Sequence, residues 1–344
     1  MKSIIRVKTQ SQNYEVIIDV LKHINFDTEV LLVTTQSVAN IFLDNILTYI
    51  EANKVETCIL PDGEEQKTLQ TIEKILNKAF EVKLNRNSMM IALGGGVITD
   101  MVGFASGIYQ RGIGFVSIPT TLLAMVDASV GGKCGVNNAY GKNLIGLFHQ
   151  PKAVYIDLRF LETLPKREFN AGFAEIIKIL ACFDYSLLQD FHANQIETYI
   201  KRSIELKALI VQEDEQEKNG KRALLNYGHT FAHVIELEGR FSKYLHGEAV
   251  SMGIIMANTL SQKLGILSEE IALCIENLLK QCGLPTKYKI ENIESFYQAF
   301  FLDKKSLDSK LHFVLLESTS IIQAKVHNTI PKETLFEVLY EFSK

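Results

Sequence analysis

The sequence predicts an α/β domain with a mostly parallel sheet, followed by a mainly α-helical domain. In the first half of the chain, short apolar runs alternate with helix-like stretches, which is typical of a parallel sheet covered by helices on both faces. Beyond about residue 165 glycine becomes sparse and apolar residues recur at helical spacing. Because 344 residues are too many for one ordinary core, we expect one domain over residues 1–165 and a second over 166–344.

The elements of the first domain are expected to alternate between strand and helix. Apolar runs predict strands over residues 30–34, 57–60, 88–93, 114–118 and 153–157, and helical spacing predicts helices over 37–53, 68–80 and 97–109. Helical spacing then continues from 169 to 282, and two short runs near the C-terminus, 311–316 and 321–326, predict a hairpin.

Composition and charge exclude several classes of protein. The net charge of −4 argues against a general nucleic-acid binder, which is usually basic. No stretch approaches 18 apolar residues and the first ten residues lack the apolar core of a signal peptide, so we expect no membrane span and no secretion. The five cysteines are scattered and form no C-x-x-C, which favours reduced cysteines in a cytoplasmic protein.

A glycine-rich turn, Gly94-Gly95-Gly96, joins a predicted strand to a predicted helix. Glycines at this point let the backbone approach a pyrophosphate, and the start of the helix offers free N–H donors, as in Rossmann-like domains. Thr99 stands where the third glycine of the dinucleotide-binding pattern belongs, so taken alone the turn fits a tight strand-to-helix connection equally well. The acids of 62–65 follow another predicted strand and could hold ribose hydroxyls or simply be solvated.

Histidines gather in one short region of the predicted helical domain. His229 and His233 are four residues apart on one helical face, and His246 follows 17 residues after His229. Glu175 lies upstream in a helical stretch. Two imidazoles and one carboxylate are the usual ligands of a catalytic zinc with an open position. The spacing leaves open which two of the three histidines bind a metal, and each alone could be a surface or core residue.

Basic residues lie within or beside the glycine-rich and polar segments. They are Lys133, Lys142, Lys178, Lys207 and Arg222. Lysine makes point-charge contacts with phosphate, and arginine can clamp a carboxylate with two hydrogen bonds. The cluster therefore predicts a small polyanionic substrate, although each residue taken singly could be a solvated surface charge.

Together these segments resemble the 3-dehydroquinate synthase family. Order and spacing agree from about residue 30 to 316. The matching segments are 61–64 with Lys67, 94–97 with Asp100, 109–112, 119–124, 126–133, 141–146, 175–178, 214–215, Arg222, 225–230, 246–250 and 303–305. No one segment is specific, but the combination is.

The resemblance implies roles for individual residues. A divalent metal, zinc or cobalt, would be held by Glu175, His229 and His246. NAD would be held by Glu64, Lys67, Gly95, Gly96, Val97, Asp100, Thr120, Thr121, Asp127, Lys133, Lys142, Thr163 and Leu164. The substrate site would contain Asp127, Lys133, Lys142, Asn143, Lys178, Lys207, Arg222, Asn226, His233 and one of Lys304 and Lys305. Members of the family are usually homodimers, and Arg111 would reach the partner subunit's site.

The implied reaction converts 3-deoxy-D-arabino-heptulosonate 7-phosphate to 3-dehydroquinate and phosphate, a step of the shikimate pathway. The nearest alternatives are sister sugar-phosphate cyclases that make an inosose, a valiolone or an aminated dehydroquinate. Arg222 and Lys207 suit a substrate carboxylate, which favours dehydroquinate over the carboxylate-free products. A metal-dependent polyol dehydrogenase of related fold is a more distant alternative, and a non-catalytic NAD-binding protein is a third.

Overall fold

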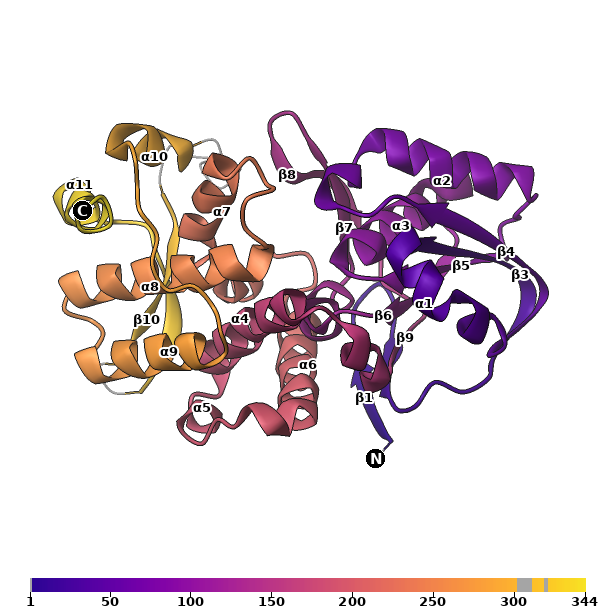
Figure 1. Cartoon of the computed structure of the whole chain (residues 1–344), viewed down its shortest axis with the longest axis horizontal. Coiled ribbons are helices and arrows are strands. Elements are labelled where there is room, and N and C mark those ends of the chain that lie inside the picture. The colour runs from indigo at the N-terminus through magenta and orange to yellow at the C-terminus, as the bar shows by residue number, and fades with distance from the viewer. Residues whose placement is uncertain (1, 302–310, 319–320) are drawn as a thin grey trace. The chain divides into compact units, whose positions relative to one another are not determined.

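The computed structural model describes residues 2–301, 311–318 and 321–344, and its contacts divide the chain into two compact units (Figure 1). The first unit contains the residues up to Pro165 together with Lys207–Gln216. The second unit contains Lys166–Leu206 and Glu217–Lys344. The segment Lys207–Gln216 thus belongs to the first unit, although it follows 41 residues of the second.

A seven-stranded sheet forms the centre of the first unit. Its strand order is β1-β2-β9-β6-β5-β3-β4, and all neighbours are parallel except β1 and β2. The strands are β1 (Ser3–Val7), β2 (Tyr14–Ile18), β3 (Ile24–Thr35), β4 (Ile50–Leu60), β5 (Met89–Gly94), β6 (Gly114–Pro119) and β9 (Ala153–Ile156). The predicted α/β class with a mostly parallel sheet is confirmed.

Helices follow most of these strands. They are α1 (Gln36–Leu47), α2 (Leu69–Glu81), α3 (Gly96–Ile108) and the short turns η1 (Glu64–Gln66), η2 (Tyr109–Arg111), η3 (Ala124–Ala128) and η4 (Leu158–Thr163). Alternate residues of β3 and β5, such as Leu31, Val33 and Met90, share one buried cluster with Ile75 of α2 and Met101 of α3. The period-two burial of the strands and the apolar stripes of the helices therefore build one core.

A hairpin that the sequence patterns did not predict packs on α3. Its strands, β7 (Lys133–Asn138) and β8 (Gly141–Phe148), are antiparallel and form a separate two-stranded sheet. Gly103 of α3 lies directly against the side chain of Cys134, where a Cβ atom would collide with the sulfur. The absence of a side chain at Gly103 therefore lets the hairpin approach the helix closely.

The predicted helix over 37–53 is wrong at its C-terminal end. Helix α1 ends at Leu47, and β4 begins at Ile50. Residues 50–52 pair in parallel with residues 24–26 of β3, so sheet pairing outweighs the local helical spacing. The antiparallel strands β1 and β2 were also missing from the prediction.

The second unit is mainly helical, as the sequence predicted. Its helices are α4 (Lys166–Phe183), α5 (Ser186–Gln189), α6 (Ile196–Glu213, in the first unit from Lys207 on), α7 (His229–Glu238), α8 (His246–Lys263), α9 (Glu269–Gln281), α10 (Ile293–Ala299) and α11 (Lys332–Glu341), with the turns η5 (Ala193–Gln195) and η6 (Arg222–Asn226). The predicted late hairpin is present as antiparallel β10 (Phe313–Glu317) and β11 (Gln323–His327).

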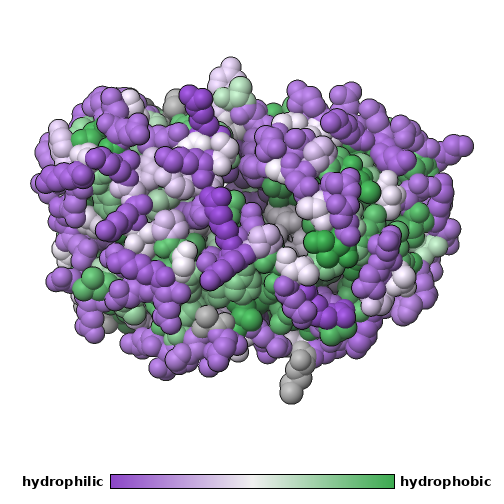
Figure 2. Space-filling model, viewed as in Figure 1, coloured by the Kyte–Doolittle hydropathy of each residue, from purple (hydrophilic) through white to green (hydrophobic). Residues whose placement is uncertain are grey.

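Hydrophilic residues predominate on the face of the molecule shown in Figure 2, and hydrophobic residues lie among them in patches. Large exposed apolar side chains such as Ile41 and Phe80 occur, as they do on most folded proteins. Among the described residues, no helix has both the length and the apolar character needed to cross a membrane.

Candidate active site

Three side chains from three helices of the second unit converge on one point. Glu175 lies in α4, His229 is the first residue of α7, and His246 is the first residue of α8. The Nε2 atoms of His229 and His246 lie 3.6 Å and 3.4 Å from Oε1 of Glu175. One possible ligand atom from each residue lies within 4.8 Å of the others, an arrangement that suits a shared cation.

The second ring nitrogen of each histidine is held by a neighbouring oxygen. Nδ1 of His229 lies 3.2 Å from the carbonyl oxygen of Tyr227, and Nδ1 of His246 lies 3.1 Å from Oε1 of Glu236. A proton on each Nδ1 would be donated to these acceptors, which leaves Nε2 as the nitrogen that can bind a metal. Histidine ligands in metal sites are commonly oriented by such an outer acceptor.

The starts of α7 and α8 fix the two histidines. Gly228, with φ +78°, precedes His229 and lies so close to α8 that a side chain would collide with Ile254. At the start of α8, the backbone N–H of Leu245 donates to Oε2 of Glu248 at 2.9 Å. Arg167 of α4 donates to both oxygens of Glu248 at 2.7 Å, so one ion pair ties the start of α8 to the helix that carries Glu175.

The charges at this point favour a cation. Burial raises the pKa of Glu175, but the ammonium of Lys178 and hydrogen bonding to His246 outweigh it, and the pKa falls to about 2. Burial likewise lowers the pKa of His246, but Glu236 and Glu175 outweigh it and raise the pKa to about 10. The two carboxylates therefore stabilise positive charge where the rings meet Glu175.

These residues fit a divalent metal. Both oxygens of Glu175 are buried. Their close neighbours are the ammonium of Lys178 and the two imidazole nitrogens. Two imidazole nitrogens with one buried carboxylate are the ligand set of many catalytic zinc sites.

Two other predicted substrate residues of the second unit, His233 and Lys178, lie beside this cluster. The ring of His233 lies one helical turn after His229, with 5.7 Å between the ring centroids. Lys178 is buried beside Glu175, and Arg222 is buried in η6. Asn226, at the end of η6, donates from its side-chain amide to Oε1 of Glu217 at 3.1 Å.

In the first unit, the glycine-rich turn and the predicted threonines meet at the carboxyl ends of β5 and β6. Gly95 precedes α3, and the N–H of Thr120 donates to the carbonyl of Gly94 at 3.0 Å. A Cβ atom on Gly95 would lie 3.1 Å from Cγ2 of Thr121. Gly96 and Val97 open α3, so their N–H groups belong to a helix start, where anions bind in parallel sheets of this kind.

A buried lysine links three more predicted NAD residues. The ammonium of Lys67 donates to Oδ2 of Asp100 and to Oδ1 of Asn143, each at 2.6 Å. Burial lowers the pKa of Lys67, but the charges of Asp100 and Glu64 outweigh it and hold the pKa above its usual value. The ammonium of Lys142 lies 3.8 Å from Oε1 of Glu64. These side chains form one polar network in the first unit, called the Lys67 network below.

The returning segment Lys207–Gln216 supplies a further predicted residue. The buried Lys207 donates to the carbonyl oxygen of Asp127 at 2.6 Å and to the carboxylate of the same residue. Lys207 and Asp127, both predicted to line the substrate site, are therefore in direct contact.

Four further predicted residues lie in the first unit. Lys133 begins β7 with an exposed side chain, and Arg111 is exposed in a turn where its own φ is +70°. Thr163 and Leu164 close η4, and their hydrogen bonds run to Phe160 and Leu161 of that turn. Lys304 and Lys305 lie outside the described residues.

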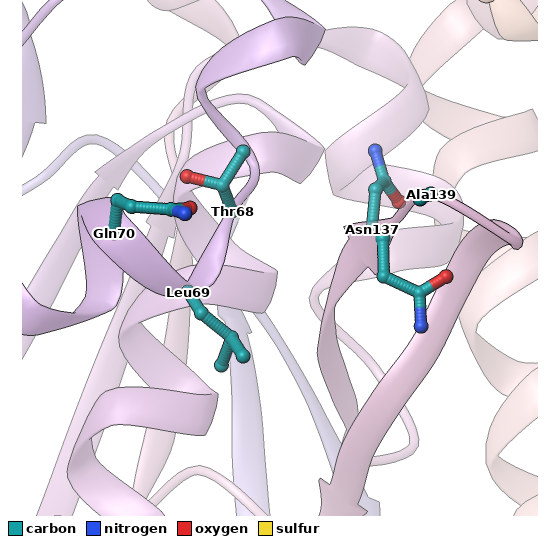
Figure 3. Close-up of a pocket in the computed structure, with 6 residues that line it drawn as sticks. Thr68, Leu69, Gln70, Asn137 and Ala139 are labelled. Atoms are coloured by element: carbon teal, nitrogen blue, oxygen red, sulfur yellow. The ribbon is translucent and has the colours of Figure 1, made fainter.

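A cavity of about 340 Å³ lies between the start of α2 and the tip of the β7–β8 hairpin. Figure 3 shows Thr68 and Gln70 on one side of it and Asn137 and Ala139 on the other. Asn137 also contacts Glu64 of the Lys67 network. The cavity therefore borders the residues predicted to hold NAD.

Sequence reasoning missed Glu236, Tyr227 and Asn137. Glu236 follows His229 by seven residues, about two helical turns, so helical periodicity could have placed it on the same face. Tyr227 acts through its backbone carbonyl, which leaves no signal in the residue type. Asn137 lies between the matched segments 126–133 and 141–146, in a hairpin that the sequence patterns did not predict.

Comparison with solved structures identifies the class of protein. The chain superposes on a 2-deoxy-scyllo-inosose synthase that is bound to carbaglucose-6-phosphate, NAD+ and Co2+. The TM-score is 0.84, the identity is 25%, and the match covers 99% of this chain and 100% of the other. It also superposes on a 2-epi-5-epi-valiolone synthase from Streptomyces hygroscopicus that has NAD+ and Zn2+ bound. The TM-score is 0.85, the identity is 25%, and 96% of each chain is covered. The fold is that of the sugar-phosphate cyclases.

Sequence comparison narrows the class to one family. Models of the N-terminal and C-terminal parts of 3-dehydroquinate synthase match residues 57–171 and 172–306. A 3-dehydroquinate synthase of Helicobacter hepaticus is 53% identical over 352 aligned positions, which cover 100% of this chain and 99% of the relative. The chain belongs to the 3-dehydroquinate synthase family.

Proposed function

We propose that the protein converts 3-deoxy-D-arabino-heptulosonate 7-phosphate to 3-dehydroquinate and phosphate, with NAD and a divalent metal. The proposal rests on the cluster of Glu175, His229 and His246, found in a chain that matches the 3-dehydroquinate synthases along its whole length. The 2-deoxy-scyllo-inosose and valiolone synthases with NAD+ and Co2+ or Zn2+ support the choice of cofactors.

The chemistry needs a redox step that is later reversed. Bound NAD would supply hydride exchange at C5, and a bound zinc or cobalt ion would supply Lewis-acid polarisation of the oxygen there. With C5 a ketone, the proton on C6 becomes acidic, and phosphate leaves from C7 with the electron pair of the C7–O bond. After C5 is reduced again, the ring opens and C7 attacks the C2 carbonyl, so no net oxidation occurs.

Residues of the second unit would hold the reacting groups. Glu175, His229 and His246 are assigned to the metal, with Glu236 and the Tyr227 carbonyl orienting the two rings. We assign His233 and Lys178 to the substrate phosphate, where positive and hydrogen-bonding groups favour the departing dianion. The phosphate itself would take the C6 proton, because no base of the chain is needed once its oxygens are held near that atom.

The substrate carboxylate is assigned to a different pair. Arg222 is buried and always charged, so it suits a two-point contact with a carboxylate, and Asn226 would bind a neighbouring hydroxyl. Lys207, which contacts Asp127 in the first unit, is assigned to the substrate on the resemblance alone. A substrate without a carboxylate would leave Arg222 without its natural anion, which is why dehydroquinate formation is favoured over the sister reactions.

Residues of the first unit are assigned to NAD. The N–H groups that open α3 at Gly96 and Val97 would bind the pyrophosphate, and the Lys67 network with Thr120 and Thr121 would bind the nucleosides. The supporting observation is that most of these residues meet at the carboxyl ends of β5 and β6 or in the Lys67 network.

We further propose a homodimer in the cytoplasm. Arg111 is exposed in a turn in which Gln110, Arg111 and Gly112 all have positive φ, a conformation that presents its side chain outward for a partner subunit. The five cysteines are free, which suits a reducing compartment.

The decisive experiment follows phosphate release and 3-dehydroquinate formation together, with substrate, catalytic NAD and zinc-loaded or cobalt-loaded protein. Equal yields of both products, loss of both with a chelator, and no accumulation of NADH are expected. Accumulating NADH would instead indicate a dehydrogenase. Turnover of glucose 6-phosphate or sedoheptulose 7-phosphate, with none of the proposed substrate, would identify a sister cyclase.

A further inference from the structure

The β7–β8 hairpin is irregular at Asn137. The register shifts between Val136 and Asn138, where the single residue Asn137 of β7 faces residues 142–144 of β8. Such an irregularity turns a side chain and its N–H group away from the regular ladder of the hairpin. Asn137 is thereby directed at other segments of the first unit.

Three polar groups of Asn137 contact Glu64 and Lys67, which the proposed function assigns to NAD, and Asn143, which the resemblance assigns to the substrate site. Its backbone N–H donates to the carbonyl oxygen of Lys67 at 2.9 Å. Its side-chain Nδ2 donates to Oε1 of Glu64 at 2.8 Å, and its Oδ1 accepts the backbone N–H of Asn143 at 3.0 Å. The half-buried side chain of Asn137 thus joins Glu64 of η1 to Asn143 of β8, the residue that accepts from Lys67.

The contact with Asn143 supports an unusual backbone conformation. Asn143 has φ +54°, in the left-handed region that costs a residue with a side chain about 1 kcal/mol. Its own side chain accepts from the ammonium of Lys67, which also binds Asp100. The orientation of the Asn143 side chain therefore depends on a backbone turn that Asn137 holds.

We propose that Asn137 is a positioning residue of the NAD site, which sets the Glu64 carboxylate and the Asn143 turn without itself being needed to contact the cofactor. The inference rests on the proposed function, because it takes Glu64, Lys67 and Asn143 as residues that hold NAD or substrate. It adds a residue that the resemblance and the sequence patterns did not assign.

The two contacts require an amide. The Glu64 carboxylate can only accept, so its partner must donate, and the Asn143 N–H can only donate, so its partner must accept. Aspartate at 137 would keep the second contact but place a carboxylate 2.8 Å from that of Glu64. Alanine would remove both contacts. Asn137→Asp is therefore the sharper test, because shape and the acceptor are retained.

The experiment measures the dissociation constant of NAD by calorimetry on the zinc-loaded full chain. For Asn137→Asp we expect NAD to bind about tenfold more weakly, as for the loss of one hydrogen bond to a charged group. The matched control is Asn138→Asp, which adds the same charge one residue away. The Asn138 side chain accepts from the N–H groups of Tyr140 and Gly141, and aspartate would keep both contacts. The control should change the constant less than twofold.

A double-mutant cycle tests whether Asn137 affects NAD binding through its contact with Glu64. In the Asn137→Asp, Glu64→Gln double variant the glutamine amide can donate to the new carboxylate, so the polarity of the contact is reversed and repulsion disappears. We expect Asn137→Asp to weaken NAD binding far less in the Glu64→Gln background than in the parent. Equal effects in both backgrounds would contradict positioning through Glu64.

The outcomes separate this inference from the proposed function. If the parent protein does not bind NAD, the proposed function fails. If the parent binds NAD and Asn137→Asp binds it equally well with an unchanged melting temperature, only the positioning role is overturned. If Asn137→Asp does not fold, Asn137→Ser, which keeps one hydroxyl as donor or acceptor, should bind NAD with intermediate affinity, and parent-like affinity would refute the role.

Discussion

The carboxylate of Glu236 lies 3.1 Å from Nδ1 of His246, while Nε2 of the same ring lies 3.4 Å from Glu175. The imidazole is thus held between two buried carboxylates, one in α4 and one in α7. With Nδ1 protonated toward Glu236, the ring presents Nε2 to the proposed metal as an electron-rich ligand.

Replacing Glu236 should therefore weaken metal binding. We expect Glu236→Gln to lower the affinity for zinc by about 10-fold to 100-fold, because a neutral amide orients and polarises the ring less than a carboxylate. Competition with a chromophoric chelator would measure this directly. Glu238→Gln is the control, since Glu238 accepts from Tyr288 on the surface and glutamine can do the same. Equal affinities for the two variants would contradict the role of Glu236.

The two histidines of α7 should behave differently. Since His229 meets Glu175 and His233 lies outside the ligand cluster, His229→Ala should remove metal content and turnover together. His233→Ala should retain metal but lose turnover, because we assign it to the substrate phosphate. Elemental analysis of the two purified variants decides between the assignments. Retained metal in His229→Ala would sink the ligand assignment.

Removing the metal should also lower stability. A ligand that binds only the folded chain stabilises it by about 2.7 kcal/mol at a free concentration 100 times its dissociation constant. We expect a chelator to lower the melting temperature of the parent and to have little effect on His229→Ala. If neither the chelator nor added zinc changes the melting temperature of the parent protein, a metal at this site is contradicted.

The ion pair of Arg167 with Glu248 should matter more for the metal than for the fold. The Arg167 side chain is 58% exposed, so its loss in Arg167→Ala should lower the free energy of unfolding by no more than about 1 kcal/mol. Metal affinity should fall by a larger factor, because the pair ties the first turn of α8, which carries His246, to α4. Urea unfolding and chelator competition on one variant would show whether the two effects separate.

Lys67 should be required for the first unit to fold stably. Lys67→Met leaves Asp100, whose side chain is only 17% exposed, without its cation, and we expect a loss of roughly 3 kcal/mol in the free energy of unfolding. Adding Asp100→Asn should recover part of this loss, because the charge is then removed. Urea titrations of the parent, single and double variants provide the test, and an unaffected single variant would be inconsistent with the ion pair described.

The sequence predicted the alternating half well because long apolar runs and the glycine turn carry their own signal. The prediction failed where contacts between residues distant in sequence determine the secondary structure. Residues 50–52 have helical spacing but pair with residues 24–26, and the hairpin of β7 and β8 is held by packing on Gly103 rather than by strand-like alternation. Strand β2 has an apolar sequence with alternating burial like that of the predicted strands, so its absence from the prediction is an omission and not a lack of signal.

The candidate site could likewise be predicted only in part, because some of its residues are defined by contacts between distant segments. Residue types and spacing pointed to two histidines and one glutamate, but not to which histidines, since His229 and His233 share a helical face. The structure shows that His246, from the start of another helix, comes to Glu175 instead. Glu236 and the backbone carbonyl of Tyr227 are acceptors behind the rings, and such partners become visible only when the helices are packed.

The return of Lys207–Gln216 to the first unit bears on how the chain is made. Glu215 accepts hydrogen bonds from the backbone N–H groups of Gln10 and Ser11 and from the side chain of Gln150. When residue 165 has left the ribosome, these donors still lack their acceptor, and residues 166–206 must emerge before it arrives. The nascent first unit is thus unfinished until part of the second has been translated, so a pause in synthesis between the two stretches would prolong an incompletely closed intermediate.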